Sequence, residues 1–253
     1  MIKKLLPLAI AAAFSAGSAH AANFVNGGFE DGTTSSWTQG SGYWNTANMA
    51  DLTPANYSTG GTYYNAAYSS VTVTNTGGVD AFSGLSTVRY GNHAVKVNDA
   101  NNNYSVNLIK QTVLNYDAST INFSWAAVLQ ASHGPTDSDN FTISLRDDTL
   151  GSNVATISYN SATNGPLFSV NGSVFYTRWI DEVINVTQGH DYTLSLLAAD
   201  CPYGGHWGYV YLDGFGSVTG GGGGSGTVPE PGSLALLGLG LAGLAASRRK
   251  KSA

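Results

Sequence analysis

The strongest constraint on the fold is a set of short runs in which apolar and polar residues alternate. The clearest run places Ile121, Phe123, Trp125, Ala127 and Leu129 at every second position. Similar runs recur at residues 141–145, 154–159, 174–179, 194–198 and 209–212, separated by turn residues at 164–166, 171–172 and 188–190. A period of two is typical of strands, and no stretch of helical length between residues 23 and 218 carries an apolar stripe. We therefore predict an all-β fold, an antiparallel jelly-roll β-sandwich, in preference to an α/β fold.

The first 21 residues have the pattern of a signal peptide. Lys3 and Lys4 precede an apolar run that ends at Phe14, and the small residues Ala19 and Ala21 form a cleavage site. We expect signal peptidase to remove residues 1–21. The alternative is a short membrane anchor, which the length of the apolar run disfavours.

The last residues, 228–253, carry a second targeting pattern. Pro229, Glu230 and Pro231 precede an apolar segment, and a basic cluster follows it, made of Arg248, Arg249, Lys250 and Lys251. We predict one short transmembrane helix over 233–247 with its basic end in the cytoplasm, transiently held in the inner membrane. At 1.5 Å per residue the apolar run rises about 21 Å, short of the ~30 Å hydrocarbon core.

A glycine-rich stretch, residues 219–227, separates this tail from the rest of the chain. Such a stretch has no side chains with which to build a core, so it is typical of a flexible linker. The predicted globular domain therefore spans residues 22–218.

Together the Pro-Glu-Pro triplet, the short apolar helix and the terminal basic cluster resemble the PEP-CTERM sorting tail of Gram-negative bacteria. The resemblance implies recognition by an exosortase, removal of the tail, and release or attachment at the cell surface alongside exopolysaccharide. Two prolines keep the triplet extended and accessible to an enzyme at the membrane face. An ordinary single-pass anchor is the alternative.

The charge distribution argues against nucleic acid as a partner. The chain has a formal net charge of −5, but fifteen of its sixteen carboxylates and only five of its eleven cations lie between residues 23 and 227. A domain of this sign repels a phosphate backbone. It suits calcium, neutral glycans or solubility alone.

Both ends of the domain carry motifs that point to one class of fold. The opening Asn26–Gly27–Gly28–Phe29–Glu30 and the closing Tyr209–Val210–Tyr211–Leu212–Asp213, with a hairpin expected over 186–194, resemble the galactose-binding-like jelly rolls of carbohydrate-binding modules. The resemblance implies that the first and last strands are adjacent and that Glu30 and Asp213 hold a structural calcium ion, helped by carbonyl oxygens and water. The alternative is that both are surface carboxylates without a ligand.

Aromatic residues crowd the region 40–70, where Tyr43, Trp44, Tyr63 and Tyr64 are candidate glycan contacts. Flat rings bordered by amides and hydroxyls suit the C–H faces and hydroxyl groups of sugars. The same rings would equally cover one side of the sandwich. Polysaccharide is the partner that this cluster indicates.

For two residues of the closing region, the sequence leaves two alternative roles each. Cys201 is the only cysteine, so an intrachain disulfide is excluded, and its thiol is either buried or available for intermolecular pairing. His206, in a segment that resembles a closing motif of large bacterial surface proteins, is either a ligand or a satisfied turn histidine.

The sequence favours a binding protein over an enzyme. It contains no nucleophile-elbow, zinc-protease or paired-cysteine motif, and no pair of carboxylates stands out as catalytic. We predict an exported cell-surface or extracellular-matrix protein, sorted by an exosortase, that binds or embeds in exopolysaccharide of a biofilm. The alternatives are a structural matrix protein without a specific glycan, or a polysaccharide hydrolase or lyase.

Overall fold

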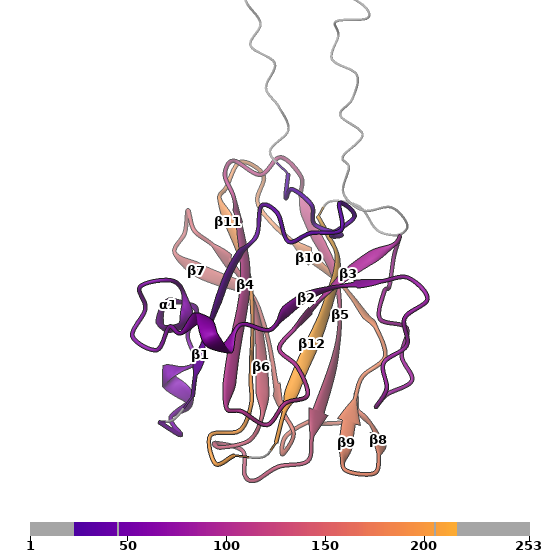
Figure 1. Ribbon diagram of the computed structural model, residues 1–253. Helices are drawn as coiled ribbons and strands as arrows, with labels where there is room; N and C mark the ends of the chain where they lie inside the picture. Colours follow the sequence, from indigo (N-terminus) through magenta and orange to yellow (C-terminus); the bar gives the residue numbers. More distant parts are fainter. Residues whose placement is uncertain (1–22, 45, 205, 217–253) are drawn as a thin grey trace, which may run out of the picture. The chain divides into compact units, whose positions relative to one another are not determined.

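The computed structural model describes residues 23–44, 46–204 and 206–216. These form two antiparallel β-sheets that pack face to face, with very little helix (Figure 1). The all-β prediction is confirmed. The predicted signal peptide, linker, transmembrane helix and sorting signal lie outside the described residues. Within the described residues, no helix combines the length and the apolar character that a membrane span requires.

One sheet has five strands in the order β1-β4-β11-β6-β7. Their bounds are β1 Thr38–Tyr43, β4 Ser105–Val113, β11 Tyr192–Ala199, β6 Asn140–Asp147 and β7 Ser152–Asn160. In the central strand, Leu196 lies opposite Ile109 of β4 and Ile143 of β6. All pairs in this sheet are antiparallel, so its apolar side chains alternate in register across neighbouring strands.

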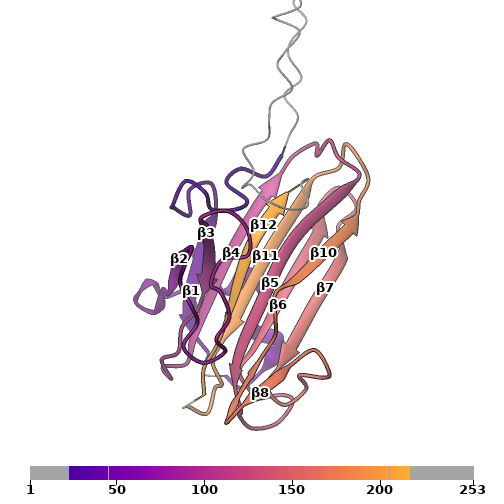
Figure 2. The same cartoon turned by 90° about the vertical axis from the view of Figure 1, so that its right-hand side faces the viewer.

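The other sheet has seven strands, with β2-β3-β12-β5-β9-β8 as its path and β10 paired to β5. Their bounds are β2 Val71–Asn75, β3 His93–Val97, β12 Gly208–Gly216, β5 Thr120–Gln130, β9 Val174–Tyr176, β8 Ser169–Asn171 and β10 Ile180–Asn185. Figure 2 shows β12, β5 and β10 running side by side. The predicted run 174–179 is a strand only as far as Tyr176, where β9 ends.

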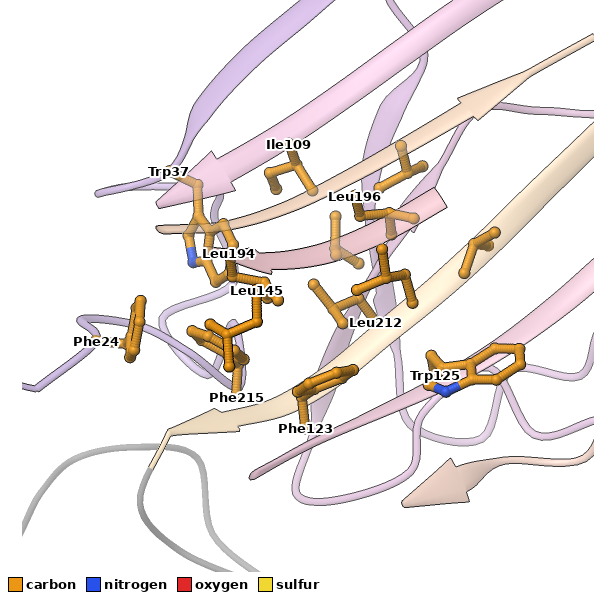
Figure 3. Packing of buried hydrophobic residues seen from close by; sticks show 14 of the residues in the cluster. Phe24, Trp37, Ile109, Phe123, Trp125, Leu145, Leu194, Leu196, Leu212 and Phe215 are labelled. Atoms are coloured by element: carbon orange, nitrogen blue, oxygen red, sulfur yellow. The ribbon is translucent and has the colours of Figure 1, made fainter. Parts of the chain in front are cut away.

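The main core lies between the two sheets (Figure 3). Phe123 and Trp125 of β5 and Leu212 of β12 meet Ile109 and Leu196 from the opposite sheet. All five side chains are at most 1 % exposed. Burying each one contributes roughly 1.5–3 kcal/mol, which is why the alternation seen in the sequence specifies this packing.

The chain passes repeatedly from one sheet to the other, as in a jelly roll. It runs from β4 to β5, back to β6, and later from β10 through β11 to β12. The hairpin predicted over 186–194 is therefore wrong, because β10 pairs with β5 whereas β11 pairs with β4 and β6. The turn residues correctly mark a chain reversal, but turn chemistry does not decide which strand the returning chain joins.

The opening motif packs against the end of the last strand. The Phe215 N–H donates to the carbonyl of Gly27 at 3.0 Å. A Cβ on Gly27 would lie 1.7 Å from the carbonyl oxygen of Phe215, so only glycine permits this approach. The implied pairing of the first and last strands is therefore wrong: β12 lies between β3 and β5, whereas the first strand, β1, pairs with β4 in the other sheet. An irregular segment, not a strand, joins the opening motif to the end of β12.

Each sheet also carries a covering segment on its outer face. Residues 44–68, with the short helices η1 (Met49–Asp51), α1 (Pro54–Tyr57) and η2 (Ala66–Tyr68), form a second apolar cluster with β4 and β11. On the seven-stranded sheet, Asp80 accepts hydrogen bonds from the hydroxyls of Tyr209 and Tyr211 at 2.6 and 2.8 Å. These contacts hold the segment 79–90 on the sheet.

Candidate functional site

The Glu30 carboxylate lies against the loop that precedes β3. It accepts the backbone N–H of Asn92 at 2.9 and 3.0 Å on its two oxygens and that of His93 at 3.0 Å. Gly91 has a φ of +65°. A Cβ at this position would lie 2.4 Å from Oε1 of Glu30. The loop can therefore close around the carboxylate only because residue 91 is glycine.

Asp213 of β12 lies beside the same loop and is fully buried. Its Oδ2 accepts the backbone N–H groups of Arg89 and Tyr90 at 2.9 and 2.8 Å, and its Oδ1 accepts that of Gly214 at 2.6 Å. Burial raises the pKa of Asp213 to about 7, with a smaller contribution from the negative charge of Glu30. The three hydrogen bonds oppose this rise in pKa. The structure thus places Glu30 and Asp213, from opposite ends of the domain, against the same loop.

This pair is compatible with a hard cation in charge and in ligand type. Carboxylate oxygens are what calcium prefers, and two neighbouring carboxylates repel each other unless a positive charge is added. The backbone N–H groups of residues 89, 90, 92, 93 and 214 donate to the same oxygens. A cation would share these oxygens with the N–H donors, and Glu30 and Asp213 would hold it.

The four aromatic residues predicted to contact a glycan have different environments. Trp44 is 0 % exposed and packs with Tyr57 in the cluster under residues 44–68, so its inclusion among ligand contacts is wrong. Tyr63 is half-buried against the same cluster, with its ring 5.9 Å from that of Tyr57. Tyr43 and Tyr64 are also half-buried. A sequence cannot distinguish an inward-facing ring from an outward-facing one in an irregular segment.

Tyr43 packs with two tyrosines that were not among the predicted glycan contacts. Its ring lies 5.1 Å from that of Tyr104 and 5.5 Å from that of Tyr68. All three side chains are half-buried, and the exposed Asn101, Asn102 and Asn103 directly precede Tyr104. We refer to Tyr43, Tyr68 and Tyr104 as the tyrosine group. Its rings combine apolar faces with polar hydroxyls, and the run of asparagines before Tyr104 is the signal that could have identified it.

Cys201 and His206 lie in the loop between β11 and β12. Cys201 is fully buried, as the first of the two predicted alternatives has it, and its Sγ is 3.4 Å from Nδ1 of His206. The ring of His206 lies 4.9 Å from that of His133. Burial, and then the nearby His133, lower the pKa of His206, so its imidazole is neutral at pH 7.

Comparison with known proteins identifies the class of the C-terminal tail. Residues 227–250 match the model of the PEP-CTERM protein-sorting motif. The predicted PEP-CTERM resemblance is confirmed, and the chain is a precursor that carries this sorting motif. No curated protein matches the chain.

Several solved structures are similar to this chain at low sequence identity. TmCBM61 in complex with β-1,4-galactotriose is 15 % identical, with 76 % of this chain and 95 % of that chain covered and a TM-score of 0.40. Caldicellulosiruptor saccharolyticus CBM27-1 in complex with mannohexaose is 12 % identical, with 76 % and 94 % covered and a TM-score of 0.38. The enzymatically active domain of bacteriophage CBA120 tailspike protein 4 is 13 % identical, with 78 % of this chain but only 21 % of that chain covered and a TM-score of 0.38.

The sorting motif has a direct consequence for the place of action. A chain that ends in a PEP-CTERM motif is an exported protein, held at the membrane before it is processed. The described part of the chain that precedes the motif is an antiparallel β-sandwich.

Proposed function

We propose that the domain spanning residues 22–218 binds extracellular polysaccharide without chemically altering it. The observation that carries this proposal is the tyrosine group. The ring of Tyr43 lies 5.1 Å from that of Tyr104 and 5.5 Å from that of Tyr68. All three side chains are half-buried at one edge of the sandwich. Tyrosine offers a large rigid contact area and a hydrogen-bonding hydroxyl at low conformational cost, which suits a ligand that has both C–H faces and hydroxyls.

The polar groups beside the tyrosine group favour a neutral ligand. Asn65 and the three asparagines 101–103 are exposed there and carry amides without charge. Amides both donate and accept hydrogen bonds, as sugar hydroxyls do. Tyr64 adds a fourth half-buried ring next to Asn65.

Delivery is proposed to follow the route that the sorting motif indicates. Signal peptidase would cleave after Ala21, an exosortase would recognise Pro229–Glu230–Pro231, and the basic residues 248–251 would remain cytoplasmic. The processed domain would then act at the cell surface or in the extracellular matrix, embedded in the exopolysaccharide of a biofilm.

A structural role in the matrix is the second candidate function. The low content of charged residues and the half-buried tyrosines are compatible with a protein that packs into a matrix without recognising one glycan. Saturable, sugar-competed binding separates the two functions, because matrix packing needs no such site. A sugar-release assay separates both from a hydrolase or lyase.

The test is a binding titration of the mature domain with β-1,4-galactotriose, mannohexaose and the exopolysaccharide of the producing bacterium. We expect Tyr43→Ala and Tyr68→Ala each to weaken binding by more than about tenfold, since aromatic anchors of this kind contribute well over 1.4 kcal/mol. Tyr176→Ala is the matched control, because Tyr176 is also half-buried but lies in β9 of the other sheet. Equal effects of all three variants, or no saturable binding, would refute the proposal.

We also propose that Glu30 and Asp213 hold a structural calcium ion. The closeness of the two carboxylates supports it, since the charge of Glu30 opposes ionisation of Asp213. When bound, calcium would supply the positive charge that lets both carboxylates ionise. The residues themselves fix the loop before β3 to the end of β12, which the ion would strengthen.

A further inference from the structure

One cluster of side chains has no part in the proposed function. His133 lies in the loop between β5 and β6, whereas Cys201 and His206 lie in the loop between β11 and β12. The atoms by which these three side chains would bind a metal all lie within 4.8 Å of one another. The two loops belong to distant parts of the sequence, so the fold itself creates this cluster.

The backbone fixes Cys201 and His206 in a position to share a ligand. The Cys201 N–H donates to the carbonyl of His206 at 3.0 Å, which closes the loop and brings the two side chains together. Just before Cys201, the buried Asp200 accepts from Asn98 Nδ2 at 2.9 Å and from the Ser105 N–H at 3.0 Å. These contacts anchor one side of the cluster to the sandwich.

The separation of the two ligand atoms agrees with a shared metal ion. Zinc binds a thiolate at about 2.3 Å and an imidazole at about 2.0–2.1 Å, so a tetrahedral site places S and N roughly 3.5 Å apart. Cys201 Sγ and His206 Nδ1 are 3.4 Å apart. A thiol–imidazole hydrogen bond would also produce this distance, so the third residue decides between the two interpretations.

His133 is that third residue. It is exposed, and among the described residues no hydrogen bond holds its imidazole, yet its ring lies 4.9 Å from that of His206 at an interplanar angle of 86°. A hydrogen-bonded thiol has no use for a second imidazole, whereas a metal ion does. The widest separation in the cluster, at most 4.8 Å, exceeds the roughly 3.5 Å of a tetrahedral site by about 1.3 Å, a movement that an exposed loop can make.

We propose that Cys201, His206 and His133 bind a divalent metal ion of borderline softness through one thiolate and two imidazoles, and that zinc is the preferred ion. The ion replaces the thiol proton, which is released to solvent, and a water molecule occupies the fourth position. The site joins the β5–β6 loop to the β11–β12 loop. In an exported domain with a single cysteine, it provides the cross-link that a disulfide cannot.

The experiment is a titration of the chelator-treated, reduced mature protein with Zn²⁺ and with Co²⁺, followed by native mass spectrometry and absorption spectroscopy. We expect one ion per chain and a thiolate-to-cobalt charge-transfer band in the near ultraviolet. Cys201→Ser removes the band. His133→Ala weakens zinc binding by more than about tenfold, since even partners that only orient a ligand change affinity by 10–100-fold.

His190→Asn is the matched control. His190 precedes β11 and Cys201 follows it, so the two lie at opposite ends of a strand about 26 Å long. The control must bind zinc as the parent does. Because His133 is exposed, its variant remains informative if Cys201→Ser does not fold. Zinc binding that is absent, that His133→Ala leaves unchanged, or that produces no thiolate band would overturn the proposal.

Discussion

Asp80 supports a sharp prediction about what holds the segment 79–90 on the seven-stranded sheet. The hydroxyls of Tyr209 and Tyr211 donate to its Oδ2 at 2.6 and 2.8 Å, and both tyrosines are at most 3 % exposed. Ser83 donates to Oδ1 through its N–H and its hydroxyl at 2.8 and 2.7 Å. Asp80→Ala removes the common acceptor of all four bonds.

The expected cost follows from the two tyrosine hydroxyls. Each would be left buried without a partner, and a buried unsatisfied hydroxyl costs about 1–3 kcal/mol. Loss of the bonds from Ser83 adds to this, so we expect Asp80→Ala to lower the free energy of unfolding by about 3–6 kcal/mol. Replacing Tyr209 and Tyr211 by phenylalanine in the Asp80→Ala variant removes the two buried hydroxyls that lack a partner. This should recover at least about 2 kcal/mol of the lost free energy of unfolding.

The pH dependence gives an independent check. Burial alone would raise the pKa of Asp80, but hydrogen bonds from Tyr209, Ser83 and Tyr211 outweigh it, and the pKa lies below the ordinary value of 3.8. Stabilisation from a lowered carboxyl pKa is present above the unfolded value and is lost as the pH falls through the folded value. Asp80→Asn should therefore flatten the decline of stability below about pH 4.

Urea unfolding, followed by fluorescence at several pH values, measures both effects. A loss below about 1 kcal/mol for Asp80→Ala would refute the reasoning, as would strictly additive effects of Asp80→Ala and the two tyrosine substitutions. Because the segment ends at Arg89 and Tyr90, whose N–H groups hold Asp213, the variant should also weaken any calcium-dependent stabilisation.

Two further predictions concern the carboxylates of Glu30, Asp213 and Asp139. Ca²⁺ at a hundred times its Kd should stabilise the domain by about 2.7 kcal/mol, which raises Tm by roughly 5–11 °C for a chain of this size. Glu30→Gln or Asp213→Asn should abolish this rise in Tm. An unchanged melting curve of the parent protein would discard the calcium site. Burial raises the pKa of Asp139 well above its ordinary value, against a hydrogen bond from Ser161. The folded state then binds a proton that the unfolded state releases above about pH 4, so stability falls as the pH rises towards the folded pKa. Asp139→Asn should remove this part of the decline in urea unfolding between pH 5 and pH 8, and an unchanged pH profile would contradict it.

The strands that the sequence predicts are those whose two faces differ or whose apolar run is long. β5 was predicted almost to its ends, because Ile121 to Leu129 alternate towards the core. β4 was missed, because both of its faces mix apolar and polar residues: Ile109 points to the main core and Leu108 to the cluster under residues 44–68. Its mixed sequence, with Asn107 and Lys110 inside it, hides the period of two that a half-exposed strand displays.

The candidate sites also differ in whether the sequence predicts them. Glu30 and Asp213 could be paired from sequence, because each ends a recognisable motif at one end of the domain. The tyrosine group and the cluster of His133, Cys201 and His206 could not, because their members come from segments whose spacing in the chain carries no information about distance in space.

Local patterns in the chain were enough to predict the sorting tail, with the export that it indicates, and the all-β class, since a sorting motif and strand periodicity are properties of neighbouring residues. Which strands pair, that both faces of β4 are covered, that Trp44 is buried, and that one thiol lies near two imidazoles were decided only when the two sheets and their covering segments packed together. Apolar burial drives that packing, and it acts between residues far apart in sequence.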